Sequence, residues 1–340
     1  MERRRKEFML IKKMHTIDKN MTKTVALRYA MGMAMAVFSL CTLSGCGDKK
    51  PDLTTAVTKT AQYEQQTVTA PVSDSLGGEW VVIPLARSGE KAEDDYFEKY
   101  RANLEKRLKE QNGILSENRY TEYSRAVLAA KAIGEDPTDI GGFDIQAPLE
   151  DYEAVTAQGI NGAVFALLAL NADQADPNGE LEQKYLAYIL EQEKPDGGFS
   201  LDDSAELADV DITAMALQSL AAYQDEKQVK EVIEKGIKVL ADAQDKDGGY
   251  VSYGDKSSES ISQVILTLST YGIDCETDER FQKNGKGLYD VLMDFYQKDG
   301  SFSHLTDGEA DPMATDQGFC ALVAYQRFKN GKSAFYDMTD

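Results

Sequence analysis

The chain has 340 residues, enough for one large domain or two small ones that bury a real core. It carries 58 acidic residues against 37 basic ones, a net charge of −21 at pH 7. So acidic a protein repels nucleic acid and anionic lipid, which excludes a nucleic-acid-binding function.

Residues 1–46 have the composition of a secretory signal. A stretch with many Lys and Arg residues ends at Arg28, and a weakly polar to apolar run from Tyr29 to Gly45 follows. The sequence leaves the start codon open, since Met14 or Met21 would give a leader of more usual length.

The apolar run ends at Leu43-Ser44-Gly45-Cys46, which is similar to the lipobox of bacterial lipoproteins. This similarity implies cleavage before Cys46 and lipidation of its thiol, so that the protein is extracytoplasmic and anchored to the cell membrane. The alternative is a plain signal peptide or a membrane helix with an incidental cysteine, but the run is short for a spanning helix. Without the leader, 28 basic and 55 acidic residues remain, a net charge of −27.

Residues 47–75 are predicted to form a disordered tether. They are mostly Thr, Gln, Lys and Asp, with too few large apolar residues to bury the surface that ordering requires. The folded domain is therefore predicted to span residues 76–340.

From residue 76 onward the apolar residues follow a helical period. Segments with one apolar stripe are predicted as outer helices, at 94–111, 148–154, 181–192, 227–243 and 285–296. Segments that are apolar nearly all round are predicted as inner helices, at 79–85, 121–133, 161–173, 211–223, 259–271 and 313–325. No alternating strand pattern of useful length is present, so an all-α architecture of paired inner and outer helices is expected.

A short phrase recurs three times in the second half of the chain. It reads Pro195-Asp196-Gly197-Gly198-Phe199, then Lys246-Asp247-Gly248-Gly249-Tyr250, then Lys298-Asp299-Gly300-Ser301-Phe302. The aspartates lie 51 and 52 residues apart, which indicates a helix-pair unit that is copied along the chain. We expect the glycine to take a left-handed conformation at the end of one helix and the aromatic residue to pack between units.

These turns, together with Gln244-x-x-Asp247-Gly248 and the stretch 158–167, resemble the prenyltransferase and squalene-cyclase repeat proteins of bacterial cell surfaces, relatives of the transcobalamin helical domain. The resemblance covers roughly residues 76–328 and implies an (α/α)6 toroid built from repeats of about 50 residues. It does not imply one function. The chain lacks the C-terminal β domain with which transcobalamin-like proteins close over a corrinoid, so no cofactor is expected.

The segment Asp209-Val210-Asp211-Ile212-Thr213-Ala214 resembles the Asp-x-Asp-Asp-Thr-Ala acid motif of squalene-hopene cyclases. In those enzymes a protonated carboxylic acid donates a proton to an alkene inside an aromatic cavity. Asp211 stands at the acid position, but Ile212 replaces the following acid and Trp80 is the single tryptophan. We therefore expect Asp211 or Thr213 to cap an inner helix instead.

The inner helices of a toroid run parallel, so their N-termini meet at one mouth. The side chains expected there are hydroxyls, amides and carboxylates, which suit a sugar, a polyol or another polar ligand. They are Thr121, Tyr123, Asn161, Asp211, Thr213, Glu259, Ser262, Thr315 and Asp316. They provide no clear set of nucleophile, base and orienting group.

No metal site is expected after the leader. His304 is the one histidine there, it has no Cys-His grouping around it, and it is expected to be solvated in a loop. Acidic clusters at 202–206 and 309–311 are interpreted as a solvated rim in preference to a weak calcium site. Cys275 and Cys320 could form one disulfide, but free buried thiols are favoured.

The sequence thus predicts a lipid-anchored, non-catalytic toroid at the cell surface that binds a small polar ligand, a glycan or a partner protein. The alternative is an enzyme. It would be either a terpene cyclase that uses Asp211 or a carbohydrate-active (α/α) barrel that uses Asp211 and Asp316 as its two carboxylates.

Overall fold

The computed structural model describes residues 50–173, 177–252 and 255–340, so the predicted leader and Cys46 lie outside the described residues. Apart from two-residue antiparallel strands, β1 (Val251–Ser252) and β2 (Asp255–Lys256), the regular structure in these ranges is helical. The helices are α2 (Leu53–Thr67), α3 (Trp80–Ser88), α4 (Tyr96–Glu110), α5 (Tyr120–Ala132), α6 (Tyr152–Thr156), α7 (Ile160–Asn171), α8 (Glu180–Glu191), α9 (Val210–Leu220), α10 (Lys227–Asp242), α11 (Ser258–Thr270), α12 (Leu288–Leu292) and α13 (Pro312–Lys329). No helix of the described ranges has the length and apolarity needed to span a membrane.

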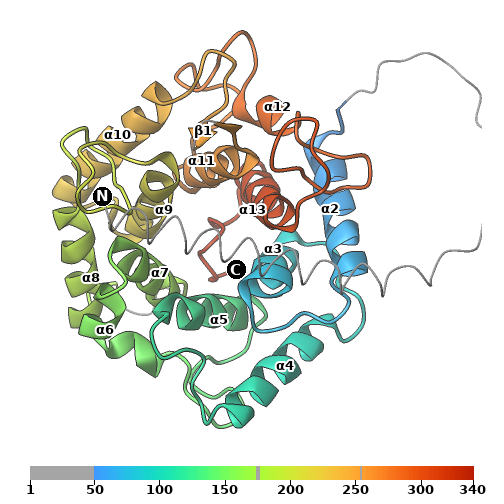
Figure 1. Cartoon of the computed structure of the whole chain (residues 1–340), viewed down its shortest axis with the longest axis vertical. Helices are drawn as coiled ribbons and strands as arrows, with labels where there is room; N and C mark the ends of the chain where they lie inside the picture. The colour runs from blue at the N-terminus through green and yellow to red at the C-terminus, as the bar shows by residue number, and fades with distance from the viewer. Residues whose placement is uncertain (1–49, 174–176, 253–254) are drawn as a thin grey trace, which may run out of the picture. The chain divides into compact units, whose positions relative to one another are not determined.

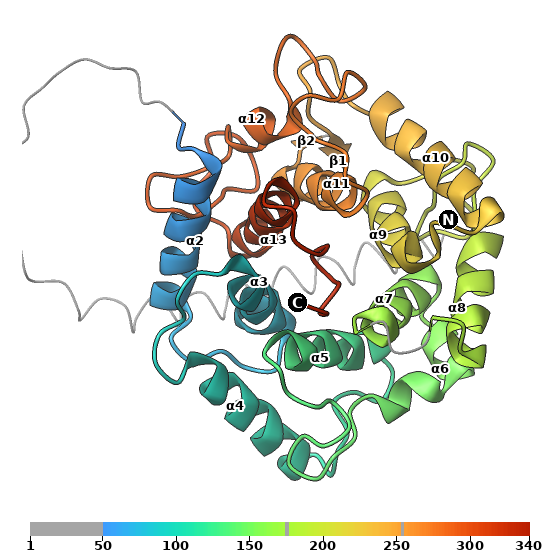
Figure 2. The same cartoon turned by 180° about the vertical axis from the view of Figure 1, so that it is seen from behind.

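Within residues 50–340 the helices form a closed ring with an inner and an outer circle (Figure 1). The inner circle consists of α3, α5, α7, α9, α11 and α13, and α2, α4, α6, α8, α10 and α12 lie outside it. Each inner helix packs on the next, and α13 packs back on α3. The same closure is visible from behind in Figure 2. The all-α toroid of the sequence analysis is therefore confirmed.

Contacts between neighbouring inner helices show that they run parallel. At the start of α5, the backbone N–H of Thr121 donates to the side chain of Gln158, which lies just before α7, at 3.2 Å. At the other end, Nζ of Lys131 on α5 donates to the carbonyl oxygen of Ala169 on α7 at 3.0 Å. The start of α5 therefore lies beside the start of α7, and the end of α5 beside the end of α7. Parallel inner helices have their N-termini at one mouth of the ring.

Residues 53–67 correct the prediction of a disordered tether over 47–75. They form α2, whose first turn is capped by Asp52 through a 2.9 Å bond from the N–H of Thr55. Ala56, Val57 and Ala61 of this helix are completely or almost completely buried, and α2 packs on α13. The average composition of this segment concealed a narrow stripe of small apolar residues, which α13 and the turn at Gly300 cover from the far end of the chain.

The three recurring turns have the predicted conformation. Gly197, Gly248 and Gly300 have φ values of 94°, 91° and 103°. The aromatic residues that follow them, at positions 199, 250 and 302, are all fully buried. The repeat therefore marks the point where each of the outer helices α8, α10 and α12 is connected back to an inner helix.

The tyrosines that end the last three inner segments bridge neighbouring units. Tyr223 accepts a hydrogen bond from Asn171 at the end of α7, at 3.0 Å. Tyr271 donates to the carbonyl oxygen of Leu217 on α9 at 2.5 Å. These bonds give a structural role to the tyrosines that reveal the repeat in the sequence.

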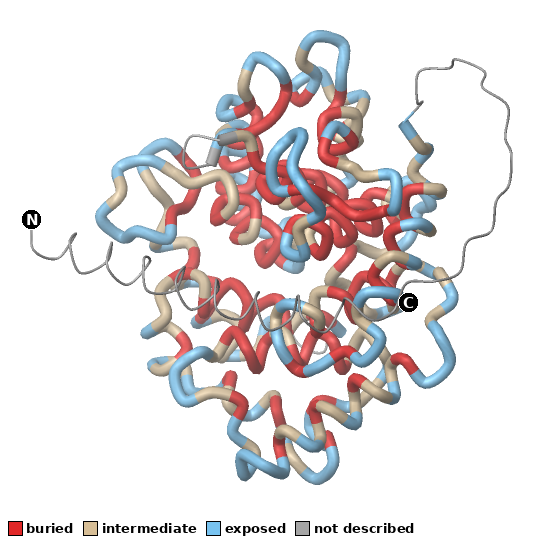
Figure 3. The backbone as a smooth tube through the Cα atoms, turned by 45° about the vertical axis from the view of Figure 1, so that its right-hand side comes forward, coloured by how far each residue is buried: buried red, intermediate tan, exposed pale blue. Residues whose placement is uncertain are grey.

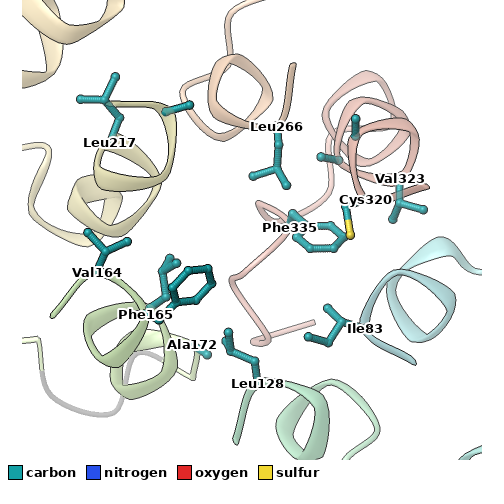
Figure 4. Packing of buried hydrophobic residues seen from close by; sticks show 14 of the residues in the cluster. Ile83, Leu128, Val164, Phe165, Ala172, Leu217, Leu266, Cys320, Val323 and Phe335 are labelled. Atoms are coloured by element: carbon teal, nitrogen blue, oxygen red, sulfur yellow. The ribbon is translucent and has the colours of Figure 1, made fainter. Parts of the chain in front are cut away.

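The centre of the ring is filled by side chains. The rings of Trp80 on α3 and Phe165 on α7 lie 5.9 Å apart between helices that are not adjacent in the circle. The segment after α13 enters the centre, where Phe335 is buried near Cys320, as the close view in Figure 4 shows. In Figure 3 the buried residues gather along the inner helices and the exposed ones along many of the loops.

Candidate functional site

The start of α9 carries the acid motif, and the structure changes the role expected for two of its residues. The helix is capped by Asp209, whose carboxylate accepts the N–H of Ile212 at 2.9 Å. Asp211 lies inside the first turn and is not the cap. Thr213 is not the cap either, because its hydroxyl accepts the N–H of Phe199 at 2.9 Å and donates to the carbonyl oxygen of the same residue.

Asp211 faces the start of α11. Burial raises the pKa of its carboxyl group to about 6, and the charges of Asp209 and Glu259 add to this effect, whereas a hydrogen bond with Ser260 opposes it. Its Oδ1 atom is buried and has no hydrogen-bond partner among the described residues. Asp211 is therefore partly protonated near pH 6, the one property here that a proton donor would need.

Glu259, the equivalent residue on α11, is paired with the histidine. Its two carboxylate oxygens lie 2.8 and 2.9 Å from Nδ1 of His304. The hydroxyls of Ser257 and Ser258 also donate to Oε2 of Glu259, at 2.9 and 3.2 Å. His304 is exposed and lies in a loop, as the sequence predicted, but it is also paired with a buried carboxylate, which the sequence did not predict.

Several residues predicted at the mouth are used to hold loops. The hydroxyl of Thr315 accepts the N–H of Phe302 at 3.0 Å, as Thr213 does for Phe199. The hydroxyl of Tyr123 accepts the N–H of Leu115 at 2.9 Å and so points to the loop between α4 and α5. Asn161 begins α7 and is half-buried, while Thr121 and Ser262 are buried.

Asp316 lies apart from Asp211. It is 3 % exposed, and burial together with the charge of Glu64 on α2 raises the pKa of its carboxyl group. Glu64 is buried to the same extent, and burial raises its pKa as well. The charges that act on Asp316 therefore come from Glu64 on α2 and from Asp311 at the start of α13. The groups that act on Asp211 come from α9 and α11, which does not support Asp211 and Asp316 as a catalytic carboxylate pair.

The described residues contain no group of three or more His, Cys, Asp or Glu side chains that could hold a metal ion. Cys275 and Cys320 are free and buried, as the sequence favoured. Burial raises the pKa of both thiols, so neither is an activated nucleophile.

A pocket of about 330 Å³ lies beside the mouth, between α11, α12 and the loop that follows His304. Its floor is apolar, and its walls carry two Lys–Asp pairs. Nζ of Lys256 lies 2.8 Å from Asp247, and Nζ of Lys286 lies 3.3 Å from Asp294. The lining residues are Asp247, Gly249, Lys256, Ile261, Asn284, Lys286, Val291, Asp294, Phe295 and Thr306.

Sequence reasoning did not identify this pocket, since its lining comes from α11, α12 and three separate connections that meet only in the folded protein. One feature of the sequence could have indicated the Lys256–Asp247 ion pair. Asp247 belongs to the second recurring turn, and Lys256 lies only nine positions further along the chain.

The fold agrees with the comparison to known protein families. Residues 145–337 match the prenyltransferase alpha-alpha toroid domain, more than half of the chain. The chain belongs to this family. No curated protein matches its sequence. The family match covers α6 to α13, which include the inner helices that carry Asp211 and Glu259 and the elements that line the pocket. The structure continues the same helix pairs through α2 to α5.

Proposed function

We propose that this member of the toroid family is a non-catalytic binding module for a small polar ligand or a glycan, attached to the outer side of a cell membrane by a lipid on Cys46. The observation that carries the binding role is the pocket beside the mouth. Its walls present both signs of charge and amide and hydroxyl groups over an apolar floor. A dipolar or polyhydroxylated ligand matches that combination, since each polar group then finds a partner.

The centre of the ring supports a binding role over a terpene cyclase. A cyclase needs an empty apolar cavity in which a polyprenyl chain folds. Here the rings of Phe165 and Phe335 lie at the centre of the ring, as Figure 4 shows, and Trp80 lies 5.9 Å from Phe165. One observation favours the enzyme, namely the raised pKa of Asp211. Its neighbour Ile212 supplies no second acid, so the cyclase remains the second candidate.

The experiment that tests ligand binding uses the full chain on an array of neutral and charged oligosaccharides. We expect retention of polyhydroxylated glycans that carry a charge, and a loss of roughly tenfold in apparent affinity in Lys286→Ala. Lys227→Ala is the matched control, because this exposed lysine on α10 forms an ion pair far from the pocket lining. Equal retention by Lys286→Ala and the parent contradicts the pocket as the site.

The same preparation is incubated with squalene and with shorter polyprenyl substrates, and the products are analysed by mass spectrometry. We expect no cyclised product. A product made by the parent and absent with Asp211→Asn would establish the enzyme and overturn the binding module.

The lipid anchor is proposed from Leu43-Ser44-Gly45-Cys46 alone. Lipidation needs the thiol of Cys46, so Cys46→Ala is expected to leave the leader uncleaved or to release the protein from membranes. Metabolic labelling with a fatty acid measures the anchor directly. Labelling of Cys46→Ala as strong as that of the parent would refute it.

A further inference from the structure

The large apolar side chains that are most exposed in the described ranges share one kind of structural position. All eight lie in the connections that lead into inner helices, or at the first turn of such a helix. They are Val72, Leu76, Ile114, Leu201, Leu207, Val251, Leu305 and Met313. We call this set the apolar rim. Exposed apolar residues are usually scattered singly over a surface, so their restriction to one kind of connection is informative.

The rim follows a continuous arc of the ring. Its members precede or begin α3, α5, α9, α11 and α13, and these helices are consecutive in the circle, in the order α9, α11, α13, α3, α5. Because the inner helices run parallel, the connections that lead into them lie on the same face of the ring. Leu207, before α9, is 70 % exposed and Leu201 is 58 % exposed.

The rim is held in place by hydrogen bonds. The backbone N–H of Ala208 donates to the carboxylate of Asp196 at 2.8 Å, which fixes the loop that carries Leu201 and Leu207. The hydroxyl of Ser258 on α11 donates to the carbonyl oxygen of Ser303 at 2.9 Å, just before Leu305. A surface that is already ordered loses little conformational entropy when a partner binds.

Two of the loops that carry the rim are acidic, and the nearest cation of the first, Nζ of Lys194, binds the carbonyl oxygens of Asp202 and Asp203. Residues 201–208 and 304–310 contain five acidic residues and no Lys or Arg, and the acidic side chains are exposed. Acidic residues between apolar ones repel the head groups of anionic lipids and attract cations. The complementary surface is therefore basic and apolar at once.

We infer that the apolar rim docks a partner protein through a cationic, amphipathic segment, in which leucine-like side chains cover the rim and lysines or arginines face the acidic loops. This inference rests on the proposed role as a binding module and adds a second surface to it. The small ligand occupies the pocket between α11 and α12, whereas the partner lies across the mouth.

The test measures binding of the full chain to a labelled peptide of leucines and lysines patterned as an amphipathic helix, by fluorescence anisotropy. We expect the triple variant Leu201→Ser, Leu207→Ser and Leu305→Ser to bind at least roughly tenfold more weakly than the parent. We also expect Asp203→Lys with Glu206→Lys to weaken binding. The matched control is Glu98→Lys with Glu234→Lys, which makes the same charge change at exposed sites on the outer helices α4 and α10.

Three results would overturn the proposal. The first is equal binding by the triple variant and the parent. The second is that the parent binds a lysine peptide without leucines as tightly as it binds the amphipathic peptide, since the apolar rim would then contribute nothing. The third is binding to phosphatidylcholine or phosphatidylglycerol vesicles that the triple variant loses, which would make lipid the occupant of the rim.

The pocket variant separates this proposal from the proposed function. We expect Lys286→Ala to bind the amphipathic peptide as the parent does. We also expect the double variant Leu201→Ser with Leu207→Ser, which leaves the pocket loop at Thr306 unchanged, to keep its glycan binding. A variant that loses only glycan binding identifies the pocket as the glycan site, and a variant that loses only peptide binding identifies the apolar rim as the docking surface. If Lys286→Ala loses the peptide as strongly as the triple variant, docking at the rim is refuted.

Discussion

Arg327 on the last inner helix donates a hydrogen bond from Nη1 to the main-chain oxygen of Arg87 on the first, at 3.0 Å. Nη2 of the same guanidinium also binds both carboxylate oxygens of Asp340, at 2.6 and 2.8 Å. One almost buried side chain thus closes the ring and holds the segment that crosses its centre.

Removal of the Arg327 side chain should weaken the contact between the last and the first inner helix. Arg327→Ala leaves the Arg87 carbonyl without this donor and removes two hydrogen bonds to the Asp340 carboxylate, which keeps those from Arg87 and Ser333. We expect the free energy of unfolding to fall by roughly 2 to 3 kcal/mol. Denaturant unfolding measures this. The control is Lys329→Ala on the same helix, which removes a half-exposed ion pair with Asp274 and should change stability by less than about 1 kcal/mol. Similar losses in both variants would contradict the role of Arg327 in closure.

The third recurring turn should tolerate a side chain least. A Cβ atom on Gly300 would lie 2.5 Å from the carbonyl oxygen of Lys59, and the residue also has a positive φ. Gly272 has a positive φ too, but a Cβ atom there meets nothing within 4 Å. We expect Gly272→Ala to cost about 1 kcal/mol from backbone strain alone and Gly300→Ala clearly more. Equal melting temperatures for the two variants would show that the close approach of α2 is unimportant.

The start of α9 allows the cap to be distinguished from the unusual acid. Asp209→Ala removes the bond to the N–H of Ile212 and should lower stability by about 1 kcal/mol, whereas Asp209→Asn should keep most of it. Asp211→Asn should leave the protein at least as stable at pH 8, because burial disfavours the ionised carboxylate there. Thermal melts of the three variants check this, and a large loss in Asp211→Asn would be inconsistent with the assignment of the cap to Asp209.

The buried carboxyl groups of Glu64 and Asp316 should make stability depend on pH. Their pKa values are raised in the folded protein, mainly by burial, so the folded state binds protons more tightly than the unfolded chain. Stability is then fully present below the ordinary carboxyl pKa of about 4 and is lost as the pH rises through the raised values. We expect the parent to be less stable at pH 8 than at pH 5.

The isosteric variant Asp316→Asn tests whether the carboxyl group of Asp316 causes this pH dependence of stability. It should lose less stability than the parent between pH 5 and pH 8, since the amide does not ionise. Glu234→Gln on the exposed face of α10 is the control and should follow the parent. An Asp316→Asn variant with the same pH dependence as the parent would show that other groups cause the loss.

Local sequence determined most of the helices and the turns between them. The stripe on α10 and the glycines at 197, 248 and 300 follow from the chemistry of neighbouring residues, since apolar period and left-handed backbone are local properties. The sequence also favoured free buried thiols over a disulfide, as the structure has them. In contrast, α2 was missed because its apolar stripe is meaningful only once α13 covers it.

The candidate site depended on the tertiary structure to a greater extent. The sequence placed Asp211 and Glu259 at one mouth, because parallel inner helices bring equivalent positions together. The sequence could not predict that Asp316 interacts with Glu64 or that His304 pairs with Glu259. The residues of each pair are far apart in the chain, and packing of the helices sets the distance between them. The sequence by itself thus determined the repeated helix pair and its turns, whereas ring closure decided which polar groups are buried, which are paired, and which remain at the surface for a ligand.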